Sequence, residues 1–174
     1  MDIIIYGSQY GTARQYAEEL GRRTNMDVKS YRKVSDINSY TTIVYFGALY
    51  AGGVMGMSET IGKITFPDRK RIVIATVGLA DPTDPKNIGH IRDNIKRQLP
   101  PEVYDQAEIF HLRGGIDYSK LRFKHRIMMR LVYKKALEVP ESERNAELNA
   151  MIETYGKKVD FVDFTSLDKI IDTI

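Results

Sequence analysis

The sequence of 174 residues contains no cysteine, no tryptophan and only three histidines. Without cysteine the chain forms no disulfide, has no thiolate nucleophile and cannot bind a metal through sulfur. His90, His111 and His125 are scattered and lack the spacing of metal ligands. No Ser/His/Asp arrangement can be argued from spacing alone. The sequence therefore predicts no metal site and assigns no catalytic residue.

Long hydrophobic runs are also missing, and no stretch approaches the ~20 apolar residues needed to span a bilayer. Met1-Asp2 leads directly into an apolar segment, without the basic start or small-residue cleavage site of a signal peptide. At this length, with 43% apolar residues, one buried domain over residues 1–174 is expected rather than two. We expect a soluble cytoplasmic protein, with a peripheral position at the inner face of the membrane as a further use of the basic segment described below.

Acidic residues are absent from Ser119 to Leu137, which we call the basic segment. Seven of the 26 basic residues of the chain lie there: Lys120, Arg122, Lys124, Arg126, Arg130, Lys134 and Lys135. The remaining chain carries 19 basic against 23 acidic residues and is net acidic. One basic stripe on an acidic body lacks the broad positive surface of a nucleic-acid-binding protein, so no nucleic-acid partner is expected.

Short apolar runs alternate with helical patterns over the first two-thirds of the chain. The predicted buried strands are Ile3–Tyr6, Ile43–Phe46, Ile72–Val77 and Ala107–Leu112, with an edge strand at Val28–Tyr31. The predicted helices are Thr12–Thr24, about Met57–Lys63, and Pro85–Leu99. The alternation indicates an α/β three-layer sandwich around a five-stranded parallel sheet. After Gly114 the pattern changes to a basic insertion and extra helices over about 114–158. These include an acidic helix at Glu141–Tyr155, and a closing segment follows at Phe161–Ile174.

A polar turn joins the first strand to the first helix, and we call residues Gly7–Thr12 the phosphate loop. Backbone N–H groups and the positive end of the helix dipole meet at such a turn and favour a phosphate. The loop lacks the G-x-G-x-x-G of a dinucleotide site. Gly62-Lys63-Ile64 lacks the hydroxyl and the upstream glycine of a nucleoside triphosphatase. Ile5-Tyr6-Gly7 lacks the carboxylates of a two-component receiver.

Two further loops of small residues follow strands, at Gly47–Gly53 and Gly78–Asp84. Because ligands of parallel sheets bind at the carboxyl ends of strands, all three loops are expected at one edge of the sheet. A phosphate monoester there would accept hydrogen bonds from the amides of Gly11, Thr12 and Ala13 and from the hydroxyls of Ser8 and Thr12. Gly11 would let the backbone approach the phosphate without a Cβ in the way. The alternative is an ordinary turn with a helix cap.

The run YGSQYGTA, Tyr6 to Ala13, resembles the FMN phosphate loop of flavodoxins, especially that of the FMN domains of diflavin reductases. Ser8 and Gly11 match the pattern T/S-x-T-G-x-T, Tyr10 replaces one hydroxyl residue, and Thr12-Ala13 follows the diflavin variant. The resemblance implies a flavodoxin-like sheet in the order 2-1-3-4-5 and FMN as the cofactor. The implied FMN contacts are Ser8, Gln9, Tyr10, Gly11, Thr12 and Ala13 for the phosphate, and Ala48, Leu49, Tyr50, Ala51, Gly52, Thr76, Val77, Gly78 and Asp81 for the ring. Tyr50 is the expected stacking residue, and its alternative role is packing against the following helix.

On a helical projection, the basic segment shows an uncharged sector beside a stripe of Arg122, Arg126, Arg130 and Lys134. Like charges at this spacing repel by about 0.2–0.5 kcal/mol per pair, which favours an anionic partner. The alternatives for that partner are anionic lipid, the carboxylates of a substrate and an acidic protein. Lys124 is predicted to be a further contact with it. The structural alternative is that the sector packs on the sheet edge and some cations pair with the acidic helix.

The stretch Gly115-Ile116-Asp117-Tyr118, followed by KLRFKHRIMMRLVYKK, resembles the long insertion of flavodoxin-like, quinone-dependent protoporphyrinogen oxidases. That resemblance implies FMN-mediated oxidation of a porphyrinogen with transfer of the electrons to a quinone. The partner would then be a quinone or porphyrin-type substrate, or a redox protein. An electron-carrier flavodoxin and a cofactor-free interaction module of the same fold stay open as alternatives.

Overall fold

The computed structural model describes residues 1–50 and 52–174, and its centre is a sheet of five parallel strands. In spatial order these are β2 (Asp27–Ser30), β1 (Asp2–Gly7), β3 (Thr42–Tyr50), β5 (Arg71–Gly78) and β6 (Glu108–Arg113). Numbered along the chain, these five strands have the predicted order 2-1-3-4-5. The sequence did not predict the short strand β4 (Gly53–Val54), which pairs antiparallel with the end of β3.

Helices cover both faces of this sheet, and alternating side chains of each strand meet them. Ile4 packs with α1 (Thr12–Thr24) and the short α6 (Asp168–Ile171) on one face. Ile3 and Ile5 pack with α2 (Pro85–Gln98) and with Val103 of α3 (Pro101–Gln106) on the other. The three-layer α/β sandwich predicted from the sequence is confirmed.

The predicted helix at Met57–Lys63 is wrong. The segment consists of turns that end in a single 3₁₀ turn, Ile61–Lys63. Gly56 precedes it at φ 75°, and the hydroxyl of Thr60 donates to the carbonyl of Gly56 at 2.7 Å. Met57 and Ile61 are fully buried against the sheet. Buried residues four positions apart are typical of a helix, but here both side chains are buried from turns.

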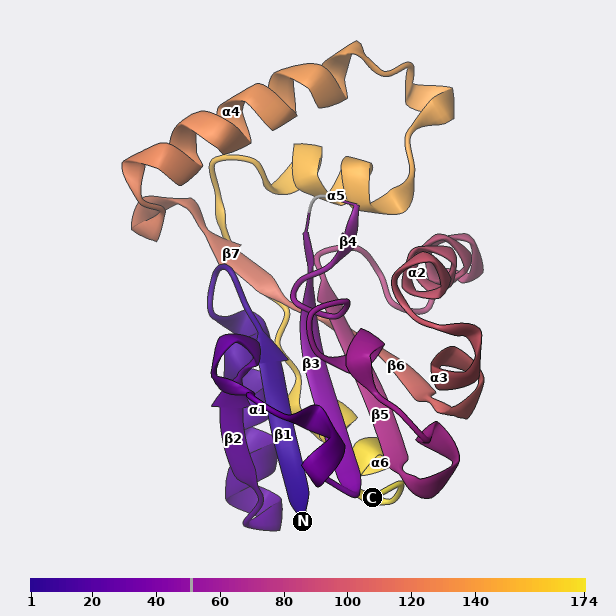
Figure 1. The fold of residues 1–174 in the computed structure, drawn as a ribbon. Coiled ribbons are helices and arrows are strands. Elements are labelled where there is room, and N and C mark those ends of the chain that lie inside the picture. Colours follow the sequence, from indigo (N-terminus) through magenta and orange to yellow (C-terminus); the bar gives the residue numbers. More distant parts are fainter. Residues whose placement is uncertain (51) are drawn as a thin grey trace.

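Residues 115–160 form a separate unit that we call the cap, and we call the rest of the chain the body. It begins and ends in a two-stranded antiparallel sheet, β7 (Gly115–Asp117) with β8 (Lys158–Asp160). Between these strands run α4 (Phe123–Glu138) and α5 (Ala146–Thr154). Figure 1 shows both helices across the end of the sheet that lies away from the N-terminus. A third hydrophobic cluster, which includes Met129 and Met151, holds the two helices together.

The acidic helix predicted at Glu141–Tyr155 is correct only in its second half. Glu141–Glu143 forms one 3₁₀ turn, and α5 begins at Ala146 because the side chain of Asn145 accepts the N–H of Leu148 at 2.8 Å. An Asn side chain at this position satisfies one of the free N–H groups of the first turn. Among the described residues, no helix has the length and hydrophobicity needed to cross a bilayer.

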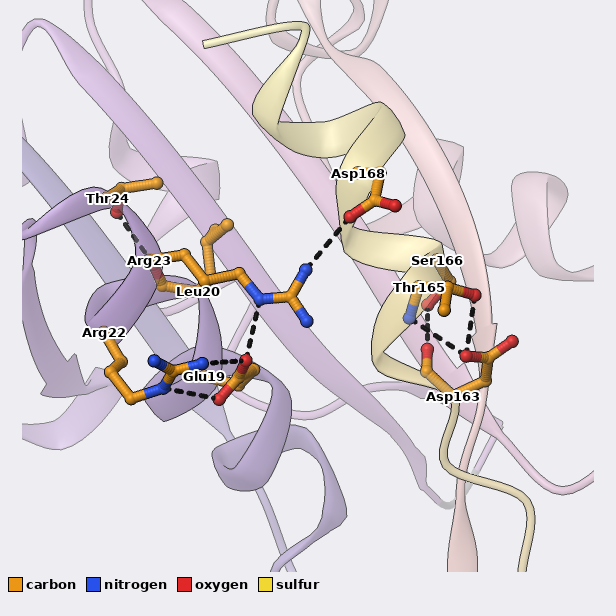
Figure 2. A network of polar contacts seen from close by, with 9 residues as sticks. All are labelled: Glu19, Leu20, Arg22, Arg23, Thr24, Asp163, Thr165, Ser166 and Asp168. Carbon is orange, nitrogen blue, oxygen red and sulfur yellow. Dashed lines mark hydrogen bonds and ion pairs between the residues drawn. The ribbon is translucent and has the colours of Figure 1, made fainter.

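The C-terminal segment after the cap returns along α1. Figure 2 shows Arg23 of α1 bonded to Asp168 at 3.0 Å, while Glu19 accepts from both Arg22 and Arg23. The hydroxyl of Tyr16 donates to the carbonyl of Arg113 at 2.7 Å and accepts the N–H of Asp163 at 3.0 Å. The closing segment is therefore fixed to the first helix and to the last strand of the main sheet.

Candidate functional site

A cavity of about 420 Å³ lies between the carboxyl end of the sheet and the cap. The sheet side of its wall consists of the phosphate loop, the ends of β3 and β5, and part of α2. The other side consists of β7, α4 and α5. The predicted convergence of three loops at one edge is thus present, and the cap closes over it.

The phosphate loop is shaped by Gly11, which immediately precedes α1 and has φ 94°. Its N–H donates to the hydroxyl oxygen of Ser8 at 3.1 Å, so the hydrogen of that hydroxyl stays available to an anion. The N–H groups of Thr12 and Ala13 belong to the first turn, which has no intrahelical acceptors. The hydroxyl of Thr12 donates to the carbonyl of Gly115 in the cap at 3.0 Å. An anion here would meet two amides and the Ser8 hydroxyl.

The second loop contains Tyr50, whose hydroxyl lies 3.2 Å from the sulfur of Met128 in α4. Tyr50 lines the cavity and contacts the cap. The helix predicted after it, its alternative packing partner, is not formed. The side chain of Gln98 accepts the N–H of Val54 at 2.7 Å and donates to its carbonyl at 3.2 Å, which fixes the far side of the loop. Ala51, a predicted ring contact, lies outside the described residues.

The third loop is held by Glu147, from the first turn of α5. Its carboxylate accepts the N–H of Ala80 at 3.2 Å. A Cβ on Gly78 would lie 2.5 Å from the same carboxylate oxygen, so glycine is required for this close approach. Burial raises the pKa of the Glu147 carboxyl, and the amides of Ala80 and Leu79 and the charge of Arg113 only partly offset this. The wall of the cavity therefore contains the partly buried carboxyl group of Glu147.

Most of the predicted ring and phosphate residues are brought together. Those that line the cavity are Ser8, Tyr10, Thr12, Ala13, Ala48, Leu49, Tyr50, Gly52, Val77 and Gly78. Four others do not line it. Gln9 contacts His125 of α4 at 2.8 Å, and Thr76 contacts the ring of His111 at 2.8 Å. The carboxylate of Asp81 accepts the N–H of Thr83, and Gly11 contributes only the left-handed backbone of the turn before α1.

Sequence reasoning missed the residues that the cap contributes to the wall. The main ones are Met128, Met129, Glu147, Leu148 and Met151. Met128 and Met129 belong to the basic segment, but the sequence did not show that they would face the cavity. Nothing in the sequence indicated that a carboxylate at position 147 would reach the loop after β5.

Tyr10 presents a buried hydroxyl that has no hydrogen-bond partner in the described part of the chain. Its ring lines the cavity and meets His125 edge-on, with ring centres 6.1 Å apart. Burial, followed by the neighbouring Tyr50, raises the pKa of the Tyr10 hydroxyl, which stays neutral at physiological pH. An unpaired buried hydroxyl is costly, and a polar atom of a ligand in the cavity would relieve that cost.

The basic segment lies outside this cavity, apart from the apolar side of α4. Its seven cations are all exposed, and in the described chain none forms an ion pair. The pairing of some cations with the acidic helix, which was part of the structural alternative, is therefore not found among the described residues. The five predicted partner contacts are absent from the cavity wall, so they do not face a substrate bound there: Arg122, Lys124, Arg126, Arg130 and Lys134.

Comparison with known proteins identifies the family of the chain. No curated protein matches it. Among solved structures, it is similar to a cysteine-to-alanine mutant of flavodoxin from Pseudomonas aeruginosa, with 14% sequence identity and a TM-score of 0.41. That match covers 79% of this chain and 97% of the other. The model of the flavodoxin domain family matches residues 3–142, which extend from β1 through α4. The chain therefore belongs to the flavodoxin domain family.

Proposed function

We propose that this chain is an FMN-dependent redox protein that binds the flavin ring in the cavity beneath the cap. FMN, when bound, would supply the capacity to accept and release one or two electrons. Flavodoxin domains typically bind FMN. The cavity at the carboxyl end of the sheet, with the phosphate loop in its wall, is the observation that carries the proposal.

The residues present fit this cofactor. In the described part of the chain no lysine or arginine lines the cavity, so the phosphate would be held by the amides of Thr12 and Ala13 and by the Ser8 hydroxyl. Charge-assisted bonds of this kind contribute roughly 1.5–3 kcal/mol each. The rest of the wall is mainly apolar, as a flat aromatic ring requires. The Tyr10 hydroxyl would gain a partner.

The cap favours an enzyme over a carrier. Met128, Leu148 and Met151 cover the cavity from above, where a carrier would expose its cofactor to a protein partner. A small molecule is better suited to enter such a site. From the resemblance of residues 115–135 to the insertion of protoporphyrinogen oxidases, we propose an oxidase of that type, in which a porphyrinogen is oxidised and a quinone or redox protein receives the electrons.

A phosphate-specific titration tests the cofactor assignment. Ser8→Ala should weaken binding of FMN by about 10- to 150-fold, which corresponds to the roughly 1.5–3 kcal/mol of one charge-assisted bond, and leave binding of riboflavin unchanged because riboflavin has no phosphate. Flavin fluorescence measures both affinities. Ser39→Ala, at an exposed serine of the body, is the control. Equal losses for both flavins would contradict the proposed phosphate contact.

A second experiment tests the type of reaction. The holoprotein is mixed anaerobically with protoporphyrinogen, and the flavin spectrum is followed before and after a quinone is added. The enzyme should be reduced in one two-electron event and reoxidised by the quinone. No reduction by the porphyrinogen, together with two well-separated one-electron steps in photoreduction, would favour the electron carrier.

One observation favours a different function, that of a cofactor-free interaction module. The amide of Ala80 and the hydroxyl of Thr12, both expected to be near a flavin, are already bonded to the cap. A module of this kind would be purified without colour and would not bind added FMN or riboflavin. A visible absorption spectrum and a flavin titration distinguish the two functions.

A further inference from the structure

The outward side of α4 carries an unusual concentration of exposed apolar side chains. Eight large hydrophobic residues are exposed in the described chain, and five of them belong to this one helix. Phe123, Ile127 and Leu131 are exposed by 76%, 46% and 58%. Their spacing of four residues aligns them along one side of the helix. We call these three residues the outer ridge.

The ridge is not part of the cap's own core. Met129 and Ala136, on the opposite side of α4, are buried in the third hydrophobic cluster. The helix is therefore apolar on two sides, of which only one is packed. Figure 1 shows α4 as the outermost element of the cap, at the end of the molecule opposite to both termini.

Cations flank the ridge on both sides. Successive helix residues are about 100° apart, so Arg126 and Arg130, each one position before a ridge residue, lie on one side. Lys124 and Lys135 lie on the other. All four side chains are exposed, and none forms an ion pair in the described residues. Glu138, the last residue of α4, is the only acidic residue of the helix.

We propose that the outer ridge docks this protein on an anionic lipid surface, with α4 parallel to the membrane plane. Phe123, Ile127 and Leu131 would enter the boundary between headgroups and acyl chains, while the flanking cations contact the phosphates. Complementary charge argues for anionic lipid, and the apolar ridge argues against nucleic acid. The inference goes beyond the proposed function because it does not require FMN.

Vesicle cosedimentation of the full chain tests the docking. Binding is expected to vesicles that mix phosphatidylglycerol with phosphatidylcholine at low salt, and not to phosphatidylcholine alone. Each cation near an anionic surface contributes roughly a fivefold gain in affinity, so the double variant R126Q/R130Q should bind about 25-fold more weakly. The matched control K33Q/K63Q makes the same charge change at exposed lysines of the body and should bind normally. Absence of binding to anionic vesicles would overturn the proposal and favour an acidic protein as the partner.

A tryptophan reporter tests insertion separately from charge. Because the chain has no tryptophan, F123W introduces a single emitter at the ridge. Its emission should shift to shorter wavelength with anionic vesicles, whereas F66W, at the 65% exposed Phe66 of the body, should not shift. Binding without a shift at position 123, or an I127S/L131S variant that binds as the parent does, would overturn the role of the ridge. FMN titration of the same variants shows independently whether the cavity is intact.

Discussion

The side-chain nitrogen of Gln9 lies 2.8 Å from Nε2 of His125, a contact that joins the phosphate loop to α4 across 116 residues of sequence. The hydroxyl of Thr12, donating to Gly115, makes a second link between the same loop and the cap. Separation of the cap from the sheet would therefore break two hydrogen bonds of the phosphate loop, one of them made by Thr12, whose amide would hold a phosphate.

A double-mutant cycle measures the Gln9–His125 link. The free energies of unfolding of Gln9→Ala, His125→Ala and the double variant should show a coupling of about 1 kcal/mol, the net worth of one hydrogen bond. Urea denaturation gives these values. In the control cycle, His90→Ala replaces His125→Ala, and its effects should simply add because His90 of α2 makes no hydrogen bond to Gln9 in the described residues. Additivity in the first cycle would show that the contact contributes nothing.

Substitution of Gly11 separates backbone strain from steric blocking. A Cβ at Gly11 would meet no protein atom within 4 Å, but φ is 94°, so Gly11→Ala should destabilise the fold by about 1–2 kcal/mol. Gly89 of α2 also has open space around it but has no positive φ, and Gly89→Ala should stabilise by up to about 1 kcal/mol. Gly11→Asn should recover part of the stability because Asn tolerates this conformation. If the Asn variant still binds FMN as tightly as the parent, close approach of a phosphate to this backbone is refuted.

Glu147 should make stability depend on pH. Because burial raises the pKa of its carboxyl in the folded state, the contribution of Glu147 is full below the unfolded-state pKa and is lost as pH rises through the folded-state pKa. Glu147→Gln should therefore stabilise the protein at pH 7.5 and have little effect at pH 4. Urea denaturation at both values checks this, with Glu153→Gln, at the exposed carboxylate of the same helix, as the control. A benefit that is equal at both pH values would contradict the argument.

His111 should make stability depend on pH in the opposite direction, with stability lost as pH falls. Burial, with a smaller effect from Arg92, lowers its pKa to about 4, so the folded protein holds it neutral. The contribution of the neutral His111 ring to the free energy of unfolding is present above pH 6.5 and is lost as pH falls towards 4. His111→Gln should flatten the loss of stability between pH 6.5 and 4, whereas the same change at the exposed His90 of α2 should not. Thermal denaturation across this range distinguishes them.

The main sheet could be predicted because its signals are local. The runs Ile3–Tyr6 and Ile72–Val77 are apolar throughout, as strands covered on both faces must be, and the loop Gly7–Thr12 has the composition of a turn before a helix. The Met57–Lys63 segment was mispredicted because buried residues four apart occur in turns as well as in helices. Local spacing cannot distinguish these cases.

The cap side of the cavity could not be predicted because its contacts are distant in sequence. Glu147 and Ala80 are 67 residues apart, and Thr12 and Gly115 are 103 apart. The uncharged sector of the basic segment is visible in the sequence, but the element that covers it is not. That element is α5, whose start depends on a single Asn side chain at position 145.

The third hydrophobic cluster has a consequence for how the molecule opens. It is smaller than the two clusters that flank the sheet and shares none of their buried residues, so the cap can lose its packing while the sheet stays intact. Amide protons of α4 and α5 should then exchange with deuterium together, and earlier than those of β1 and β3. Such a cooperative opening would give a bulky molecule its route to the interior without unfolding the rest of the chain.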